Sequence, residues 1–582
     1  MRWRDVQAKH LPAGVWHGLC YNGNLSDAPM SDEGRGSSKT AAVVVVAAAL
    51  LVVLPFAFLG VPSGHDFEFH LSSWMEAVSQ WEQGIVYPRW AGLAHFGYGE
   101  PRFIFYPPAS WMLGALTGVI FPWAIAPAVF IWVALSLGGY SMYHLAREWL
   151  PPREAIAAAV LYAINPYHVV VVYWRSAYAE LLADALFPLL VLWTWRARAE
   201  PRRAIVPLSL IMAGIWLGNA PAAVIATYSF ALLTFFFAGW ERNWRTLLYG
   251  AMAIVLTLGL ATFYIIPAAW EQKWVNIAQV LSPGVRPEDN FLFTTIADPE
   301  HTVFNLLVSV VAGVEITILA VAVFITRERR REIGERWWAL VILGAASAVL
   351  MFRITDVFWE QLPKLKFVQI PWRWLVPLNV AFAMMVTAAL RRWSLRVLFL
   401  GFVVCGFVGL SSHILPPWWD HAQDIEEMHQ GVVSGKGYEG TDEYVPVGGD
   451  AYELKEDAPK VEVMSREGVK VAGATINIER WRPEERTFTV DVSQPSELIL
   501  RMFNYPAWRA SVNGHVVETG TADVTGQMMI PVAAGSNRIV LRFIRTNDRL
   551  VGIITSVAFS FMILVLFWRS RLRRGIETVR NP

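Results

Sequence analysis

The chain has 582 residues, of which 55% are hydrophobic and 17% are charged. Soluble domains carry about 25% charged residues, so the composition excludes an ordinary soluble domain and predicts a polytopic α-helical membrane protein. The formal net charge of +1 argues against a polyanionic partner such as nucleic acid. Two cysteines, Cys20 and Cys405, argue against a disulfide framework or a cysteine-based zinc site.

The first 40 residues are polar and contain Gly, Ser and Asp, and we predict that residues 1–40 form a disordered tail. Basic residues such as Arg2, Arg4 and Lys9 favour a cytoplasmic location for this tail. Residues 41–59 follow as a nearly uncharged apolar run, long enough to cross a bilayer. A cleaved signal peptide is the alternative, but no clear small-x-small cleavage site follows, so we predict an uncleaved first membrane helix.

Further apolar runs predict the remaining membrane helices at 124–144, 155–173, 180–197, 203–219, 221–239, 246–267, 303–326, 337–352, 372–390, 396–412 and 549–568. The basic connectors fall on one side of the membrane when these helices alternate in direction, and the positive-inside rule assigns that side to the cytoplasm. This arrangement predicts about twelve spanning helices with both termini inside. By the same parity the short run 109–121 cannot cross, so we predict a juxtamembrane or re-entrant helix there.

Four segments then face outward, namely 62–108, 173–178, 271–301 and 353–369, together with a large insert at 413–547. Short alternating runs between residues 461 and 543 predict an extracytoplasmic β-sandwich within this insert. Asn513-Gly514 predicts a hairpin turn between two of its strands. The predicted domains are a tail (1–40), a transmembrane domain (41–412) with its first outer loop (60–108), the β domain (413–547), and a last helix with a basic tail (548–582).

The first outer loop begins with a cluster of acids and histidines, Gly64-His65-Asp66-Phe67-Glu68-Phe69-His70. In an extended stretch Asp66 and Glu68 point the same way, which suits a general base with a second acid, or a divalent-cation site for Mg²⁺ or Mn²⁺. An exposed loop acid is the alternative. His65 and His70 can suggest zinc, but their spacing matches no known metal motif. We take His65, His70 and Tyr106 as candidates for the acceptor side of a site.

A second acidic pair, Glu180 and Asp184, lies one helical turn apart at the start of a membrane helix. Acids in a first turn also complement the helix dipole, which is the structural alternative. An unpaired charge at the depth of Asp184 costs about 2.5–3.5 kcal/mol, so we expect a partner such as Arg175 or a hydrated cavity.

Four cations gather in one outer loop and the helix start after it: Arg353, Lys364, Lys366 and Arg373. Outer loops are normally poor in basic residues, so this cluster predicts a phosphate or pyrophosphate site, with Arg175 as a further donor. Snorkelling beside interfacial tryptophans is the alternative. Arg286 lies in another outer segment that we interpret as a mobile loop or lid.

Several motifs resemble those of a known family. They are His65-Asp66 with His70, Tyr87-Pro88-Arg89-Trp90, Phe105-Tyr106-Pro107-Pro108, Arg175-x-Ala177-x-Ala179-Glu180, Pro371-Trp372-Arg373, Glu443-Tyr444-Val445-Pro446 and Tyr505-Pro506-Ala507-Trp508. With them the chain resembles bacterial membrane proteins labelled pyruvoyl-tetrahydropterin-synthase-related, of the YfhO type, within the GT-C superfamily of glycosyltransferases. The label suggests pterin chemistry, but the chain has no compact three-histidine zinc set.

The resemblance implies sugar transfer from a polyprenyl-phosphate carrier to an envelope glycan, lipid or protein, at the outer face of a bacterial inner membrane. It implies that Asp66 deprotonates or orients the acceptor and that Glu180 is the second acidic position. A lipid-linked-glycan transporter or an assembly scaffold is the alternative, and it requires polar residues at the membrane midplane. The enzymatic interpretation depends on the acids near residue 66 and the cations near residue 373 meeting in one pocket.

Overall fold

The computed structural model describes residues 32–409, 418–465 and 467–580. The chain up to Thr40 and the chain from Ala41 onward form two separate units, and the account below concerns the second. Most of the predicted tail, residues 1–31, lies outside the described residues, as do residues 410–417 near the predicted start of the β domain.

Helices follow the apolar runs of the sequence. They are α1 (Asp32–Val53), α7 (Ala126–Ala146), α8 (Pro152–Ala163), α9 (Pro166–Val170), α10 (Tyr178–Asp184), α11 (Phe187–Ala199), α12 (Pro201–Gly218), α13 (Ala220–Glu241), α14 (Arg245–Glu271), α16 (Pro299–Thr326), α18 (Glu335–Leu350), α20 (Leu375–Ala389), α21 (Trp393–Phe402) and α24 (Asn547–Arg580). Further helices lie between these runs: α2 (Phe56–Leu59), α3 (Phe67–Glu82), α4 (Ala94–Gly97), α5 (Arg102–Phe105), α6 (Pro108–Ile120), α15 (Pro287–Asn290), α17 (Arg330–Ile333), α19 (Asp356–Gln361) and α23 (Ala422–Val433).

Among the described residues, nine helices are long and apolar enough to cross a membrane, and ten if the bent pair 335–350 and 353–361 counts as one span. A helix occupies each of the twelve predicted ranges. However, α12, α18 and α21 do not satisfy these length and composition criteria by themselves, so the count of twelve stays a prediction. The short run expected not to cross forms α6, which has 13 residues.

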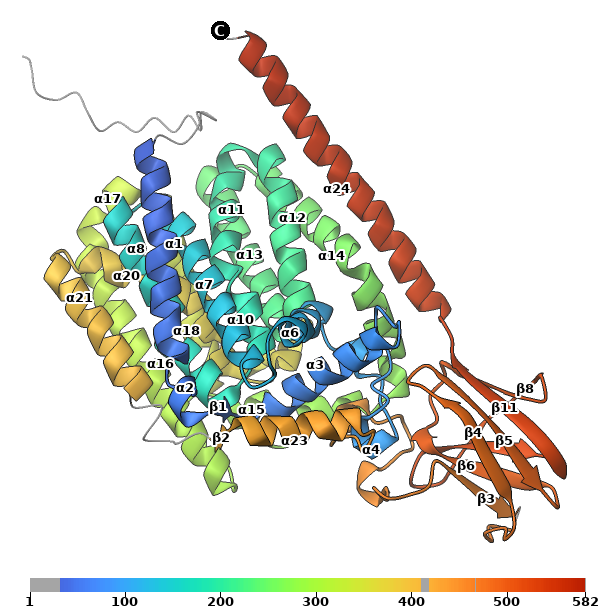
Figure 1. Cartoon of the computed structure of the whole chain (residues 1–582). Helices are drawn as coiled ribbons and strands as arrows, with labels where there is room; N and C mark the ends of the chain where they lie inside the picture. Colours follow the sequence, from blue (N-terminus) through green and yellow to red (C-terminus); the bar gives the residue numbers. More distant parts are fainter. Residues whose placement is uncertain (1–31, 410–417, 466, 581–582) are drawn as a thin grey trace, which may run out of the picture. The chain divides into compact units, whose positions relative to one another are not determined.

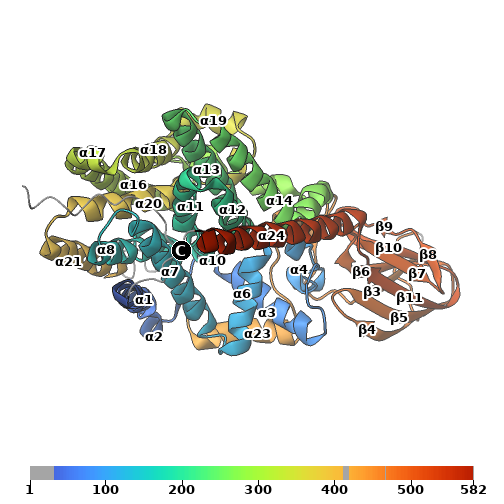
Figure 2. The same cartoon turned by 90° about the horizontal axis from the view of Figure 1, so that it is seen from above.

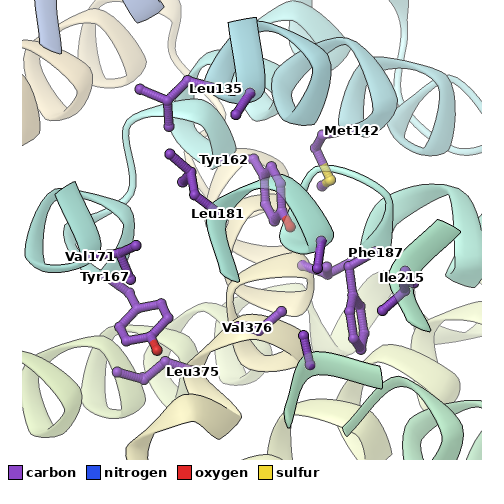
Figure 3. Close-up of a cluster of buried hydrophobic side chains, with 14 of the residues drawn as sticks. Leu135, Met142, Tyr162, Tyr167, Val171, Leu181, Phe187, Ile215, Leu375 and Val376 are labelled. Carbon is purple, nitrogen blue, oxygen red and sulfur yellow. The ribbon is translucent and has the colours of Figure 1, made fainter. Parts of the chain in front are cut away.

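The helices pack around a continuous apolar core. Figure 3 shows part of it, where side chains from α7, α8, α10, α11, α12 and α20 meet, among them Leu135, Tyr162 and Phe187. These three side chains are at most 1% exposed, so burial of apolar area stabilises this interior. Helix α20 is almost entirely buried, with 14 of its 15 residues inside the fold. A continuous apolar sequence such as that of α20 is therefore explained by burial on every side.

Two antiparallel sheets follow in the C-terminal part. One has the order β3 (Val461–Ser465), β6 (Ser496–Phe503), β10 (Gln527–Val532) and β9 (Gly520–Thr521). The other has the order β4 (Thr475–Trp481), β5 (Glu485–Val492), β11 (Gly535–Phe543), β7 (Trp508–Val512) and β8 (His515–Val517). Alternate residues of both sheets share one apolar core. The predicted hairpin is present, because β7 pairs with β8 and Asn513 and Gly514 both have positive φ.

The sheets lie at one end of the helices, on the same side as α3 and α23 and opposite to α17 (Figure 1). Seen from above, α24 leads away from the sheets along α14 (Figure 2). Buried Glu271 of α14 accepts hydrogen bonds from Arg549 of α24 at 2.7 Å and from Tyr505 of the β region at 2.5 Å. A two-stranded sheet of β1 (Val61–Ser63) and β2 (Trp418–Asp420) ties the first loop to the segment before α23.

Candidate active site

The loop before α3 is fixed against a tight turn at residues 174–176. Ser176 adopts a left-handed backbone with φ of 52°, and its hydroxyl accepts from Gly64 N–H at 2.9 Å and donates to Pro62 O at 2.8 Å. A Cβ on Gly64 would lie 2.4 Å from Trp174 O, so only glycine fits there. Asp66 N–H donates to Arg175 O at 2.9 Å. The chain therefore holds Asp66 beside Arg175, although the two are more than 100 residues apart.

A buried ion cluster lies beneath Asp66. Glu180, in the first turn of α10, accepts hydrogen bonds from Arg175 at 2.7 Å and from Arg373 at 3.0 Å. The hydroxyl of Tyr167 also donates to this carboxylate. Arg175 Nη2 lies 3.8 Å from Asp66 Oδ2. A buried carboxylate requires such partners, because desolvation of an unpaired charge costs several kcal/mol.

These groups border one cavity of about 450 Å³. Its polar lining comes from seven separate stretches of the chain: His65, Asp66, His70, Tyr106, Glu180, Asn219, Gln272, Lys364, Gln369, Arg373, Thr441 and Glu443. Apolar side chains such as Phe69, Phe105 and Phe367 complete it. A concave site with a few convergent charged groups is the usual form of a small-molecule or catalytic site.

One wall of the cavity has an unusual backbone. Lys364 and Gln369 border the short helix at Leu365–Val368, and both have positive φ, 63° and 66°. Non-glycine residues in such conformations each cost on the order of 1–3 kcal/mol and cluster at functional sites. The side-chain amide of Gln369 also donates a hydrogen bond to Val280 O at 2.8 Å, which fixes the orientation of this side chain. The two residues with this strained backbone are therefore also residues whose side chains line the cavity.

A segment of the C-terminal insert covers the cavity from another side. Thr441 N–H donates to Glu100 at 2.9 Å, and Glu100 also pairs with Arg102 at 2.5 Å and with His95 at 2.9 Å. Burial by itself would raise the pKa of Glu100, but Arg102 and His95 lower this pKa to about 2. Sequence reasoning did not select Thr441, Glu443 or Glu100 as site residues. The motif Glu443-Tyr444-Val445-Pro446 is the one feature of the sequence that indicated this segment.

Two titratable groups in the cavity wall have shifted pKa values. Burial lowers the pKa of His70 to about 4, so its imidazole is neutral near pH 7. Burial also raises the pKa of Glu443 to about 7, and the negative charge of Glu100 adds to this rise. Glu443 therefore changes charge near neutral pH, at the edge of the cavity.

The raised pKa of Glu443 gives a stability prediction. Between about pH 4.5 and 7 the folded protein binds this proton more tightly than the unfolded chain, so stability falls as pH rises, by about 2–3 kcal/mol. We expect Glu443→Gln to remove this decline, measured as the midpoint of thermal unfolding in detergent from pH 5 to pH 8. Glu439→Gln, an exposed carboxyl four residues away, serves as the control. An unchanged pH profile in the Glu443 variant would contradict the assignment.

The structure brings several sequence-predicted residues to this cavity: His65, Asp66, His70, Tyr106, Glu180, Lys364 and Arg373. Arg175 lies directly behind it, paired to Glu180. The expected extended geometry of Asp66 and Glu68 is wrong, because α3 begins at Phe67 and turns Glu68 away. Glu68 instead lines a different cavity with Asp420.

Four other candidates do not line the cavity. Asp184 is fully buried below it, with His168 Nε2 at 3.9 Å and no hydrogen bond to its carboxylate from the described residues. Arg353 is exposed, and Lys366 lies 3.9 Å from Glu360. Arg286 pairs with Asp289 at 2.9 Å. The cation cluster of the sequence therefore divides, with Lys364 and Arg373 turned toward the cavity and the other two away from it.

A metal site was considered at Asp66 and Glu68. Within the described ranges, no group of three or more His, Cys, Asp or Glu side chains is arranged to hold a metal ion. Asp66 and Glu68 also face different cavities, so this pair does not form a common ligand set.

Comparisons with known proteins give distant relatives. A Lactococcus lactis subsp. cremoris protein described as uncharacterized is 21% identical over 226 residues, which are 37% of this chain and 36% of that protein. The chain thus spans about a third of this curated relative. ArnT from Cupriavidus metallidurans, bound to undecaprenyl phosphate, matches with a TM-score of 0.34 and 13% identity over 68% of this chain and 75% of that one. The apo oligosaccharyltransferase of Archaeoglobus fulgidus matches with a TM-score of 0.32 and 14% identity over 69% and 56%.

A family match covers more of the chain. Residues 103–416, more than half of the sequence, match the family described as 6-pyruvoyl-tetrahydropterin synthase related domain, membrane protein. This range contains the ion cluster of Arg175, Glu180 and Arg373, and most of the apolar helices. The chain is therefore a membrane protein and belongs to the 6-pyruvoyl-tetrahydropterin synthase related family.

Proposed function

We propose that this protein is a GT-C type membrane glycosyltransferase, which transfers a sugar from a polyprenyl-phosphate carrier to an envelope glycan, lipid or protein. One observation carries the proposal: a carboxylate, Asp66, and two cations, Lys364 and Arg373, border the same cavity of about 450 Å³. Transfer from a lipid phosphate requires a base for the acceptor and positive charge for the leaving group. The cavity offers both.

In this mechanism Asp66 accepts the proton of an acceptor hydroxyl, whose oxygen attacks the anomeric carbon of the donor sugar. The bond from that carbon to the phosphate oxygen breaks, and the lipid phosphate leaves with the electron pair. Asp66 is suited to this role, because its side chain is 39% exposed and so reachable from the cavity. Arg373 donates hydrogen bonds through Nε and Nη1, but its Nη2 donates none to any described residue. Lys364 and Arg373 Nη2 would stabilise the developing phosphate charge.

The proposed orientation places the cavity at the extracytoplasmic face of a bacterial inner membrane, with both termini in the cytoplasm. It is supported by the connectors 196–203 and 327–336, which contain several arginines and which lie at the end of the helices opposite to α3 and the sheets (Figure 1). Basic connectors are retained in the cytoplasm. A lipid-linked donor would then reach the cavity from the outer leaflet.

The two neighbouring lysines provide a matched test of phosphate binding. We expect Lys364→Gln to raise the KM for a polyprenyl-phosphate sugar about tenfold, because one charge-assisted contact is worth about 1.5–3 kcal/mol. Lys366→Gln removes the same charge two residues away, outside the cavity, and should leave the KM unchanged. Initial rates with labelled donor in proteoliposomes measure both values. Equal effects of the two variants would exclude a specific role for Lys364.

A lipid-linked-glycan transporter is the second candidate. One observation favours it: Asp184 and Glu315 are at most 1% exposed within membrane-spanning helices, and the carboxylate oxygens of Asp184 have no hydrogen-bond donor among the described residues. Ionisable residues inside a membrane often mark transport pathways. A transporter moves its substrate intact, whereas the transferase releases lipid phosphate. Assay of released lipid phosphate therefore separates the two functions.

A further inference from the structure

A second polar cavity, of about 230 Å³, lies between the first loop, the end of α23 and the two sheets. Its charged lining is strongly basic, since one carboxylate and four cationic side chains border it: Glu76, Lys460, Arg482, Arg486 and Arg501. Glu76 is already engaged, because it accepts hydrogen bonds from Gln80 at 3.0 Å, from Leu93 N–H at 3.3 Å and from the hydroxyl of Tyr438. The cations therefore outnumber the only acid of this lining, and the carboxylate of that acid already accepts hydrogen bonds from the protein.

Arg486 is the most unusual member of this lining. It is 1% exposed, and it forms no ion pair with any described residue. Its Nη1 donates to the sulfur of Met502 at 2.5 Å, while its Nε has no hydrogen-bond partner in the described part of the chain. Burial without a compensating carboxylate lowers the pKa of Arg486 to about 9. A buried, unpaired guanidinium is costly, so a chain without a ligand here carries an uncompensated charge.

Two tryptophans give part of the compensation. The guanidinium carbon of Arg486 lies 4.6 Å from the ring centre of Trp481 and 5.1 Å from that of Trp508. Each such contact is worth on the order of 1–2 kcal/mol when desolvated, which is less than the cost of burying the charge. If Arg486 served only to stabilise the fold, the two tryptophan contacts would therefore stabilise its charge only in part.

A second arginine of this lining, Arg501, gives independent evidence for an anion site. Its Nη1 donates to Ala458 O at 3.1 Å, and its Nη2 donates to the backbone oxygens of Phe96 and Glu456. These bonds fix the orientation of the guanidinium, but its buried Nε also has no partner among the described residues. Two oriented arginines with unused donors, beside Lys460 and Arg482, form an arrangement suited to an oxyanion.

We propose that this cavity binds a phosphoryl group, carried either by inorganic phosphate or by a phosphate ester. The excess of cations favours a doubly charged anion, and guanidinium groups match the geometry of phosphate oxygens. Ligand pockets for larger molecules measure about 300–1,000 Å³, so this cavity suits a small headgroup. The site is separate from the proposed transferase cavity, because the two share no lining residue. It joins the first loop to the sheets, so the anion would strengthen that junction.

The test uses the full-length protein in nanodiscs and measures the midpoint of thermal unfolding against phosphate concentration. Sodium chloride at equal ionic strength corrects for general salt effects. We expect phosphate to raise the midpoint of the wild type in a saturable way. Arg486→Met should raise the midpoint without phosphate, because an apolar side chain removes the buried charge, and should weaken phosphate binding about tenfold or more. If Arg486 had only a structural role, Arg486→Met would instead lower the midpoint of thermal unfolding without phosphate.

Two further variants keep the test decisive if the Arg486 variant folds poorly. Lys460→Gln changes an exposed residue of the cavity and should also weaken phosphate binding, whereas Arg509→Gln, on the five-stranded sheet that carries Arg486 but outside the cavity, should not. Glycerol 1-phosphate separates the sources: stabilisation at lower concentration than phosphate assigns the site to an ester, and stabilisation by phosphate alone assigns it to the free ion. No effect beyond chloride, or equal binding in all variants, would overturn the proposal.

Discussion

We expect Asp66→Asn to reduce the rate of sugar transfer by about 10²- to 10⁴-fold, which is the usual contribution of a general base. Asparagine keeps the size of the side chain but cannot accept the proton of the acceptor hydroxyl. The fold should persist, because Asp66 is 39% exposed and lies 3.8 Å from Arg175, a distance typical of a weak ion pair. The measurement is transfer of labelled sugar from a polyprenyl-phosphate donor by purified protein in proteoliposomes.

Glu68→Gln is the matched control for this experiment. Glu68 is the other acid of the same sequence motif, two residues away, but it lines a different cavity. Its substitution should leave the transfer rate within about twofold, since Glu68 does not line the cavity of the proposed site. If Asp66→Asn folds and retains full transfer, Asp66 is not the base. If Glu68→Gln is instead the inactive variant, the reaction takes place in the neighbouring cavity.

The largest expected effect on stability comes from Glu180→Gln. This carboxylate accepts from Arg175 at 2.7 Å and from Arg373 at 3.0 Å, and its side chain is only 2% exposed. Its neutralisation leaves two buried guanidinium groups, and among the described residues the one other carboxylate within 4 Å of them is Asp66, 3.8 Å from Arg175. Removal of one partner from a buried ion cluster costs about 3–5 kcal/mol. We expect a loss of this size in the free energy of unfolding, measured by denaturing-detergent titration in mixed micelles.

Glu148→Gln provides the comparison. Glu148 also meets two arginines, Arg196 at 2.7 Å and Arg336 at 3.8 Å, but its side chain is 20% exposed. Water compensates for much of the lost charge there, so the expected cost is about 1 kcal/mol or less. Similar losses in the two variants would show that burial does not make the Glu180 cluster exceptional. A fully stable Glu180 variant would show that both arginines find other partners.

Glu180 also connects stability with function, because it orients Arg373 at the cavity. A variant that folds but loses donor affinity would identify Glu180 as a positioning residue for that cation. Arg373 has a second anchor, since its Nη1 donates to Val368 O at 2.7 Å. The donor affinity of Glu180→Gln therefore reports how far the ion cluster, rather than the backbone contact, orients this guanidinium.

Local patterns in the sequence were sufficient for the helices of the apolar runs, for most strands of the β region and for membrane association, but not for α3, which lies where an extended stretch was expected. Apolar runs of about 20 residues predict helices that cross a bilayer, and a helix occupies each such range. Alternating residues predict most of the strands, although not β9 and β10, and the residues Asn513-Gly514 predict the hairpin that joins β7 and β8. These features depend on neighbours within a few residues of each other, so a single sequence contains the necessary information.

The grouping of charges could be predicted only in part. A carboxylate in an apolar segment needs a counter-ion, and this argument predicted Arg175 or a hydrated cavity for Asp184, whereas Arg175 pairs with Glu180 instead. It did not distinguish Glu180, which lines the cavity, from Asp184, which does not. It also treated the cations between residues 353 and 373 as one cluster. Only Lys364 and Arg373 line the cavity, and the backbone of this segment has positive φ values at Lys364 and Gln369, which no local pattern predicts.

The sequence by itself determined that this chain is helical and membrane-bound, that it has a C-terminal β region, and that its candidate acids and cations include Asp66, Glu180 and Arg373. Only the tertiary structure decided which of them share a cavity, that α3 turns Glu68 away, and that Thr441 and Glu443 cover the site. It alone showed the buried, unpaired Arg486. The physical reason is that hydrophobic periodicity is a local property, whereas ion pairing and burial depend on contacts between residues hundreds of positions apart.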